Sequence, residues 1–206
     1  MSFGILIYPG VEELDFQGPW EMIGMWHKYS GGPRPLLLAR TLEPVTCAHG
    51  MRVLPDLTFE QADGLTELLV PGGYAAFDEM KQPDITAMVR RHFDTGGPTL
   101  SVCSGTFILQ AAGVLAGRKA STNWKAIKML RDLGVEVIEE RYTHDGSLWT
   151  SAGVSAGIDM LLAYIAAARG EAVASAVQLQ AEYFPEGRVY GTARVGQPVA
   201  AYIGRL

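Results

Sequence analysis

Short apolar runs alternate along the chain with longer segments in which apolar residues recur at helical spacing. The short runs predict buried strands, and they cover residues 3–8, 35–39, 67–70 and 99–103. Apolar residues three or four positions apart predict helices, and they cover residues 19–29, 84–95, 107–115, 127–133, 158–168 and 171–183. This alternation predicts an α/β fold with a mostly parallel sheet covered by helices on both faces.

Turn residues separate these segments. Gly18-Pro19 predicts a loop that leads into the first helix, with Pro19 in the first helical turn. Residues 45–54 are expected to form a hairpin that turns at His49-Gly50. The tail from Pro185 onward is expected to be irregular. Further strands are expected at residues 135–138, near 142 and at 148–150.

Composition and charge restrict the class of protein. The 206 residues are 48% hydrophobic, which is enough for one sizeable core, so a single domain over residues 1–206 is expected. The net charge of -5, without a cluster of Lys and Arg, argues against a nucleic-acid partner. The first residues lack a signal-peptide pattern, and the apolar stretch 160–168 is too short to cross a membrane. We therefore expect a soluble cytoplasmic protein without a membrane partner.

Cys103 stands where the pattern changes from strand to helix. Ser104 and Gly105 are small enough for a sharp turn there, as in the nucleophile elbow of hydrolases, although Ser101 replaces the first glycine of that motif. At such a turn the sulfur faces the first N–H groups of a helix, which favours the thiolate and predicts a lowered thiol pKa. The alternative is a buried structural cysteine at the end of a core strand.

Asp15 lies between apolar residues after the first predicted strand. The carboxyl ends of parallel strands meet at one edge of a sheet, so Asp15 is expected near Cys103. Two such groups share one proton and titrate as a pair, and the carboxylic acid then serves as a proton donor. The alternative role for Asp15 is to cap the following helix.

Backbone N–H groups near the elbow are candidates for an oxyanion pocket. Gly72 and Gly73 follow another strand, and either N–H, paired with the Ser104 N–H, is expected to stabilise negative charge. The Ser104 hydroxyl is too weak a base to activate the thiol, and its alternative role is to cap the elbow helix.

The residue directly after Cys103 is Ser104 and not a histidine, which disfavours a Cys-His protease or acyl-transfer pair. The four histidines are His27, His49, His92 and His144. The two cysteines form neither a disulfide framework nor a zinc motif. Cys47 is interpreted as structural, because no ligand cluster besides His49 is visible beside it, and no metal site is predicted.

The motifs together resemble the ThiJ/PfpI superfamily, and within it the isocyanide hydratases. The matching segments, in chain order, are LDFQGP at 14–19, VPGG at 70–73, SVCSG at 101–105, AGVLAGR at 112–118, TNW at 122–124, AGID at 156–159 and QLQAEY at 178–183. The resemblance implies a flavodoxin-like three-layer sandwich of the class I glutamine amidotransferase-like type. Several segments also resemble the ligand-sensing domains of AraC-type regulators.

The resemblance also implies residue roles. Cys103 corresponds to the nucleophile, Asp15 to its acidic partner, and Ser104 to a position where the hydratases have Thr. Asn123 departs from the His expected before Trp124, and these two residues with Tyr74 are candidates for substrate binding; Trp20 and Phe77 are further aromatic candidates for the pocket wall. The implied reaction converts an apolar isocyanide to an N-substituted formamide without a cofactor, in a homodimer.

Three functions stay open on the sequence alone. The first is the isocyanide hydratase. The second is a glyoxalase or deglycase of the same superfamily, which the missing histidine disfavours. The third is a sensor of oxidants, through Cys103, or of a small ligand; the absence of a helix-turn-helix segment after Tyr183 argues against a complete regulator.

Overall fold

A seven-stranded sheet forms the centre of the computed structural model, which describes residues 1–185 and 202. The strand order is β10-β11-β7-β6-β1-β2-β5, and all neighbours are parallel except β10 and β11. The strands are β1 (Ser2–Leu6), β2 (Arg34–Ala39), β5 (Leu57–Thr58), β6 (Glu67–Val70), β7 (Thr99–Val102), β10 (Tyr142–Asp145) and β11 (Leu148–Ser151). The predicted mostly parallel sheet is confirmed.

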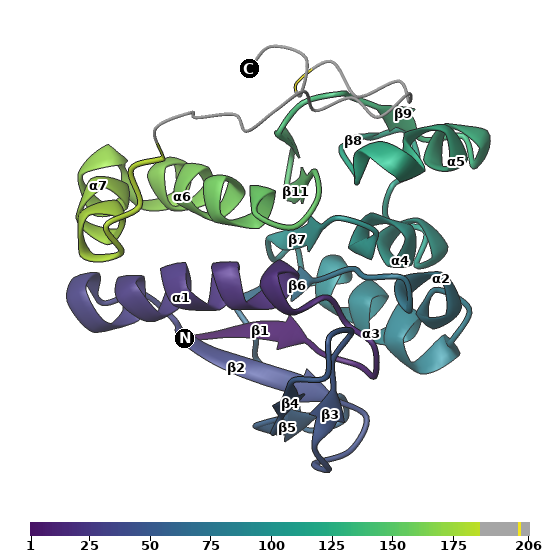
Figure 1. The fold of residues 1–206 in the computed structure, drawn as a ribbon, viewed down its shortest axis with the longest axis horizontal. Helices are drawn as coiled ribbons and strands as arrows, with labels where there is room; N and C mark the ends of the chain where they lie inside the picture. Colours follow the sequence, from purple (N-terminus) through teal and green to yellow (C-terminus); the bar gives the residue numbers. More distant parts are fainter. Residues whose placement is uncertain (186–201, 203–206) are drawn as a thin grey trace.

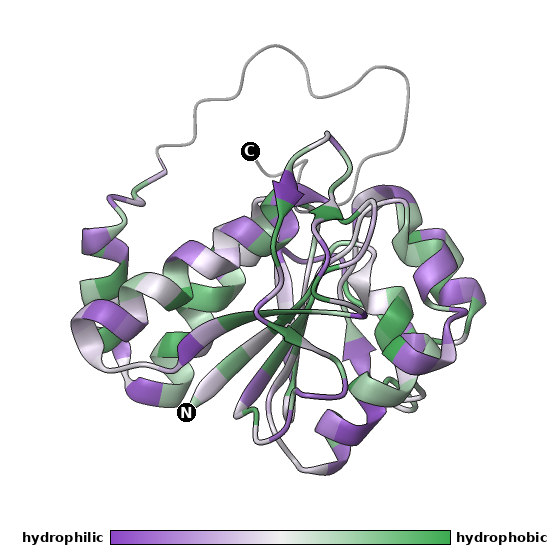
Figure 2. Ribbon diagram, turned by 90° about the horizontal axis from the view of Figure 1, so that it is seen from below, coloured by the Kyte–Doolittle hydropathy of each residue, from purple (hydrophilic) through white to green (hydrophobic). Residues whose placement is uncertain are grey.

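Helices cover both faces of this sheet (Figure 1). One layer contains α1 (Glu13–Ser30), α6 (Ala156–Arg169) and α7 (Glu171–Gln180), which contact one another. The other contains α2 (Ala76–Glu79), α3 (Pro83–Asp94) and α4 (Gly105–Ala111). Figure 2 shows the sheet edge-on between the two layers. The three-layer α/β sandwich predicted from the sequence is therefore confirmed.

Smaller elements complete the described part of the chain. The predicted hairpin is formed by β3 (Val45–Thr46) and β4 (Arg52–Val53). A second small sheet pairs β8 (Lys119–Ala120) with β9 (Glu136–Val137). Between them in sequence lie a 3-10 turn (Trp124–Ala126) and α5 (Ile127–Asp132).

Glycines let α1 approach α6 and the sheet closely. A Cβ atom on Gly18 would lie 2.8 Å from the Ile158 side chain, and one on Gly157 would lie 2.9 Å from Val102 and 3.1 Å from Pro19. All three distances are shorter than ordinary carbon contacts, so a larger residue at position 18 or 157 would force the helices apart. This close packing fixes the first turn of α1 relative to the end of β7.

The first helix begins earlier than the sequence predicts. It starts at Glu13 rather than at Gly18-Pro19, so Pro19 lies inside the helix. Proline lacks only its own N–H, whose partner would be the carbonyl four residues earlier, that of Asp15. The helix therefore continues through Pro19 with one hydrogen bond fewer.

Three short elements, α2, β5 and β8, are absent from the sequence prediction because they are too short to show periodicity. The predicted irregular tail from Pro185 lies almost entirely outside the described residues. Among the described residues, no helix is long and apolar enough to cross a bilayer.

Candidate active site

Four segments meet at the carboxyl edge of the sheet. Residues 7–15 follow β1, residues 71–73 follow β6, Cys103 follows β7, and residues 152–154 follow β11. These strands are parallel neighbours, so their carboxyl ends share one edge. The first three segments are those predicted from the sequence, and the fourth is additional.

Cys103 occupies a strained elbow. Its φ angle is 59°, in the left-handed region that residues with a Cβ rarely adopt. Its N–H donates to the Ala152 carbonyl at 3.0 Å, and its carbonyl accepts from the Thr122 hydroxyl at 2.8 Å. A Cβ on Gly105 would lie 2.1 Å from the Val70 carbonyl oxygen, so only glycine fits after Ser104. The surrounding hydrogen bonds therefore hold the cysteine in the geometry of a nucleophile elbow.

Asp15 is fully buried in the first turn of α1. Its Oδ2 accepts a hydrogen bond from the Gly72 N–H at 2.9 Å, and its Oδ1 has no hydrogen-bond partner among the described residues. The Tyr8 hydroxyl donates to the Pro71 carbonyl at 2.6 Å and holds the same turn. Asp15 does not cap the helix: Glu12 is the cap residue, without a side-chain hydrogen bond. The capping alternative is therefore wrong.

The two candidate groups have coupled proton affinities. Burial raises the pKa of Asp15 to about 7, and the charge of Glu12 adds to this, while the Gly72 N–H and the Cys103 thiol act in the opposite direction. Burial and the charge of Asp15 raise the pKa of the Cys103 thiol to about 12. The Ser104 N–H and the Asn123 side chain favour the thiolate, but they do not outweigh burial.

The predicted lowering of the thiol pKa is therefore wrong. The helix that follows Cys103 is only seven residues long, and its N-terminal field acts on a sulfur that is 7% exposed. Desolvation is the larger effect. What remains of the prediction is that the Cys103–Asp15 pair titrates as a unit.

The glycine turn is organised differently from the predicted oxyanion pocket. The Gly72 N–H is engaged by Asp15, and the Gly73 N–H donates to Ser104 Oγ at 3.0 Å. Ser104 Oγ in turn donates to the Gly73 carbonyl at 2.7 Å and makes no helix cap. Neither glycine N–H is thus free for an oxyanion, and Ser104 fixes the turn instead of capping α4.

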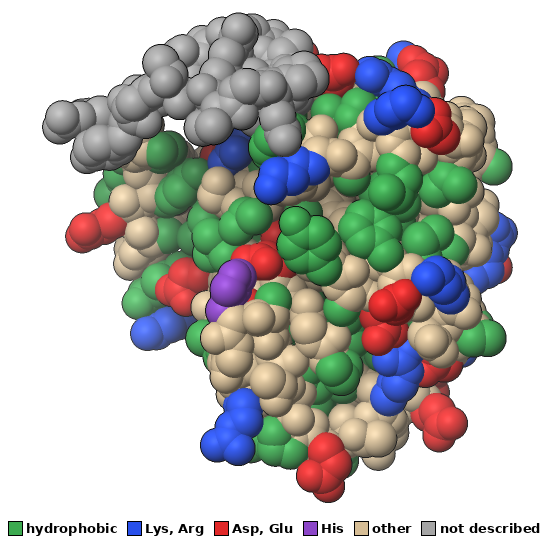
Figure 3. Space-filling model, turned by 45° about the vertical axis from the view of Figure 1, so that its right-hand side comes forward, with side chains coloured by type: hydrophobic (Ala, Val, Ile, Leu, Met, Phe, Trp, Pro, Cys, Tyr) green, Lys and Arg blue, Asp and Glu red, His purple; other side chains and the backbone are tan. Residues whose placement is uncertain are grey.

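A cavity of about 310 Å³ opens in front of Cys103. It is lined by Glu12, Gly73, Tyr74, Phe77, Cys103, Ser104, Asn123, Lys125, Ala126, Met129 and Val154. Two of the predicted substrate-binding residues, Tyr74 and Asn123, therefore face it. Trp124 does not line it, because Lys125 and Ala126 occupy the wall that follows Asn123. Figure 3 shows a face on which hydrophobic side chains gather beside charged ones.

Local geometry explains why Asn123 reaches the cavity. Its side-chain oxygen accepts from the Lys125 N–H at 3.0 Å. A Cβ on Gly153 would lie 2.5 Å from Asn123 Nδ2, so the glycine leaves space for the amide. Phe77 also lines the cavity. Its ring packs edge-on against Phe107, with the ring centroids 5.0 Å apart, and this contact holds it in place.

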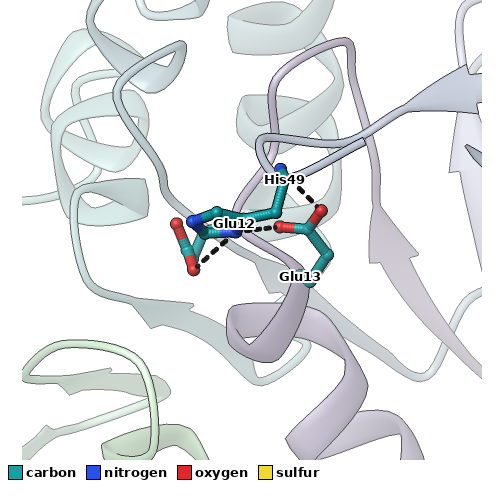
Figure 4. Close-up of side chains that lie close together, drawn as sticks. All are labelled: Glu12, Glu13 and His49. Carbon is teal, nitrogen blue, oxygen red and sulfur yellow. Dashed lines mark hydrogen bonds and ion pairs between the residues drawn. The ribbon is translucent and has the colours of Figure 1, made fainter. Parts of the chain in front are cut away.

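No histidine lines the cavity. His49 instead lies on the β3–β4 hairpin with Nδ1 2.8 Å from Glu13 Oε2 and 3.6 Å from Glu12 Oε1 (Figure 4). The three donor groups lie within 4.8 Å of one another. His49 already satisfies both carboxylates as an ion pair, so we assign no metal to this cluster.

Five cavity residues were not predicted from the sequence: Glu12, Lys125, Ala126, Met129 and Val154. Glu12 gave no signal because it lies in the segment predicted to be a loop before the helix at Gly18-Pro19. Val154 adopts a φ of 53° and brings its N–H near Asp15. The small-residue run at 151–157 was the available signal, since such runs allow unusual backbone conformations.

Comparisons with known proteins identify the family of this chain. The model of the DJ-1/PfpI family matches residues 1–167. Isonitrile hydratase from Pseudomonas putida is 33% identical over 90% of this chain and 79% of its own length. Deglycase PH1704 from Pyrococcus horikoshii is 35% identical over 55% of this chain and 69% of its own. The crystal structure of a THiJ/PfpI family protein from Pseudomonas syringae superposes with a TM-score of 0.84 at 33% identity, covering 91% of this chain and 77% of that one.

Proposed function

Because the chain belongs to the DJ-1/PfpI family, we propose that it is a cysteine-dependent enzyme that hydrates isonitriles, also called isocyanides, to N-substituted formamides. In this proposal Cys103 is the nucleophile and Asp15 is the proton donor. Asn123 and Tyr74 contact the substrate in the cavity.

One observation carries the proposal: a buried carboxyl group that keeps a proton near neutral pH lies beside a thiol on a nucleophile elbow. Burial raises the pKa of Asp15 to about 7, so the pair offers both an acid and a nucleophile at one place. Hydration of an isonitrile needs these two functions, because the terminal carbon must receive both a nucleophile and a proton.

The first half of the reaction forms a covalent intermediate. In the reactive form of the pair the proton lies on Asp15 and the negative charge on Cys103. The sulfur electron pair forms a bond to the terminal carbon, one carbon–nitrogen π bond becomes the lone pair on nitrogen, and the carbon keeps the lone pair that it already carries. This lone pair takes the proton from Asp15. The product is a thioimidate on Cys103 with an ionised Asp15.

The second half releases the formamide. Ionised Asp15 takes a proton from water while the water oxygen adds to the thioimidate carbon, and this proton is passed to the nitrogen. The carbon–sulfur bond then breaks as the new hydroxyl loses its proton to the pair. The Cys103–Asp15 pair ends with one proton, as it began. The steps balance with these two side chains and one water.

The cavity supports an uncharged, largely apolar substrate. Phe77, Ala126, Met129 and Val154 contribute apolar surface, and the isonitrile group carries no net charge. The Asn123 amide and the Ser104 N–H favour negative charge on sulfur, so they also support its departure in the last step.

A homodimer is part of the proposal. A second, open cavity of about 680 Å³ lies against the exposed side of α1 and includes Leu14, Trp20 and Ile158. Such an apolar surface is typical of a protein–protein contact. Light scattering of the purified protein tests this, with a mass of twice 22.3 kDa as the expected result.

A deglycase or glyoxalase activity is the second candidate, favoured by the similarity to the deglycase. Against it stands the arrangement at the site, where a carboxyl and an amide surround the sulfur and no histidine lines the cavity. Turnover of methylglyoxal in the absence of isonitrile turnover would favour this candidate.

The test is to mix the purified protein with an aryl isonitrile and measure formamide. We expect turnover by the wild type and by Cys47→Ala, and none by Cys103→Ala. A folded wild type whose Cys103 is alkylated by iodoacetamide but which forms no formamide would contradict the proposal. Oxidation of Cys103 at low peroxide without turnover of either substrate would favour a sensor instead.

A further inference from the structure

The cluster of Glu12, Glu13 and His49 lies at the cavity but has no role in the reaction as described. Glu12 lines the cavity, and its N–H donates to the Gly72 carbonyl at 3.1 Å. The N–H of the same Gly72 donates to Asp15 at 2.9 Å. One residue, Gly72, thus holds both the backbone of Glu12 and the side chain of Asp15.

Glu12 and Asp15 are three residues apart where α1 begins. Glu12 is the cap residue before α1 and Asp15 lies in the first turn, close enough that, in addition to burial, the charge of Glu12 raises the pKa of Asp15. A negative charge on Glu12 therefore disfavours a second negative charge on Asp15 and favours the protonated acid. Asp15 Oδ1 has no hydrogen-bond partner among the described residues, so that oxygen is sensitive to the charges around it.

His49 lies between the carboxylates of Glu12 and Glu13, as Figure 4 shows. Its Nδ1 lies 3.6 Å from Glu12 Oε1, and Glu13 holds both its ring and its backbone N–H, at 2.8 and 2.7 Å. The hydrogen bond with Glu13 and the charges of Glu12 and Glu13 raise the pKa of His49. A protonated His49 offsets part of the charge of Glu12.

We infer that Glu12 and His49 are positioning residues for the shared proton: their ion pair determines how that proton is divided between Asp15 and Cys103. The inference rests on the proposed function, in which the proton must lie on Asp15 before attack. Glu12 moves the proton toward Asp15 and so increases the thiolate, and His49 limits this effect.

The charged and titratable groups around the pair come from several elements. Burial raises the pKa of Tyr8, in the segment after β1, and the charges of Asp15 and Cys103 add to this. Lys125 lines the cavity, and Glu79 at the end of α2 also acts on Tyr8. Within residues 1–185 and 202, only Glu12 and His49 form an ion pair that reaches both the cavity and the solvent.

The test is the pH dependence of iodoacetamide alkylation, measured on the Cys103 peptide by mass spectrometry, in buffers with EDTA. The midpoint near pH 7 is expected to fall in Glu12→Gln and to rise in His49→Asn, each by about half to one pH unit. The plateau rate is expected to fall in Glu12→Gln and to rise in His49→Asn. The double variant is expected to resemble Glu12→Gln, because His49 acts through Glu12.

Glu21→Gln removes the same charge from an exposed position of the same helix and is expected to leave the profile unchanged. Shifts of equal sign in Glu12→Gln and His49→Asn, or no shift relative to Glu21→Gln, would overturn the inference. Alkylation requires no isonitrile turnover. If the alkylation midpoints of Glu12→Gln and His49→Asn shift in opposite directions but the protein forms no formamide, the proposed function is contradicted. The inference that Glu12 and His49 control the shared proton is then still supported.

Discussion

The molecule contains two pairs of a buried cysteine and a carboxyl group, and they differ in the state of the carboxyl. Burial and the charge of Glu13 raise the pKa of Cys47 to about 11, and Cys103 has a similarly raised pKa of about 12. Burial acts to raise the pKa of Glu13, but hydrogen bonds from His49 outweigh it and hold that pKa below its usual value. The pKa of Asp15 is raised to about 7 instead.

Thiol pKa alone therefore does not distinguish the reactive cysteine from the structural one. Glu13 is ionised and repels a second negative charge, so it keeps Cys47 protonated. Asp15, with a pKa of about 7, can take the proton in a minor form of the pair in which Cys103 carries the charge, and this minor form is the reactive one. The elbow conformation and the cavity then give Cys103 access to a substrate.

Removing each thiol in turn should give the largest contrast. Cys103→Ala is expected to reduce formamide formation to the uncatalysed rate, because no other group can form the thioimidate. Cys47→Ala is expected to change the rate less than about twofold, since Cys47 does not line the cavity. Steady-state turnover measures both, and equal losses in the two variants would contradict the assignment of the nucleophile.

Asp15→Asn should produce the next largest effect. Asparagine can still accept the Gly72 hydrogen bond but cannot donate a proton to carbon, so a loss of about 100-fold to 10,000-fold in kcat is expected. Glu13→Gln, which changes the carboxyl beside Cys47 in the same way, is the matched control. A similar loss in both variants would show that charge near the helix start matters more than the proton on Asp15.

Glycine substitutions compare the backbones near the two cysteines. Gly105→Ala places a Cβ against the carbonyl oxygens of Val70 and Pro71, at 2.1 and 2.7 Å, and is expected to lower stability by about 2–4 kcal/mol. Gly50→Ala in the hairpin beside Cys47 has open space, and only its φ of +92° opposes the substitution, so about 1 kcal/mol is expected. Thermal melts measure the difference. Equal melting temperatures would contradict the tight packing at the elbow.

The pH dependence of stability should show a smaller effect. The pKa of Asp15 is about 7 in the folded protein, against about 3.9 in an unfolded chain. Between these values the folded state holds a proton that the unfolded state has lost, so the contribution of Asp15 to stability falls as the pH rises from about 4 to 7. The wild type should lose on the order of 1–3 kcal/mol relative to Asp15→Asn between pH 5 and pH 8. Urea denaturation at both pH values measures it, and parallel curves would contradict the raised pKa.

The sheet and its helices could be predicted from the sequence because buried strands and amphipathic helices have distinct periods. The meeting of Asp15, the glycine turn and Cys103 followed from the rule that the carboxyl ends of parallel strands share an edge. The start of α1 was misplaced because Gly18-Pro19 is a strong local signal for a helix start. In the folded protein Gly18 is required for contact with Ile158 instead.

The parts of the site that were mispredicted depend on three-dimensional contacts. Desolvation of Cys103 depends on what covers it, which no local pattern reports. The Gly72 and Gly73 N–H groups were predicted to be free, but Asp15 and Ser104 engage them. The effect of Glu12 on the proton of Asp15 depends on its ion pair with His49. His49 is distant from Glu12 in the sequence, and the β3–β4 hairpin brings the two together.

The most direct test of the Cys103–Asp15 account is to trap the intermediate. The protein is mixed with an aryl isonitrile, quenched with borohydride, and digested for peptide mass spectrometry. The account predicts the reduced adduct on the Cys103 peptide of the wild type, little or none in Asp15→Asn, and none on the Cys47 peptide. Formamide production with no adduct on Cys103 at any quench time, or an adduct of equal yield on Cys47, would contradict it.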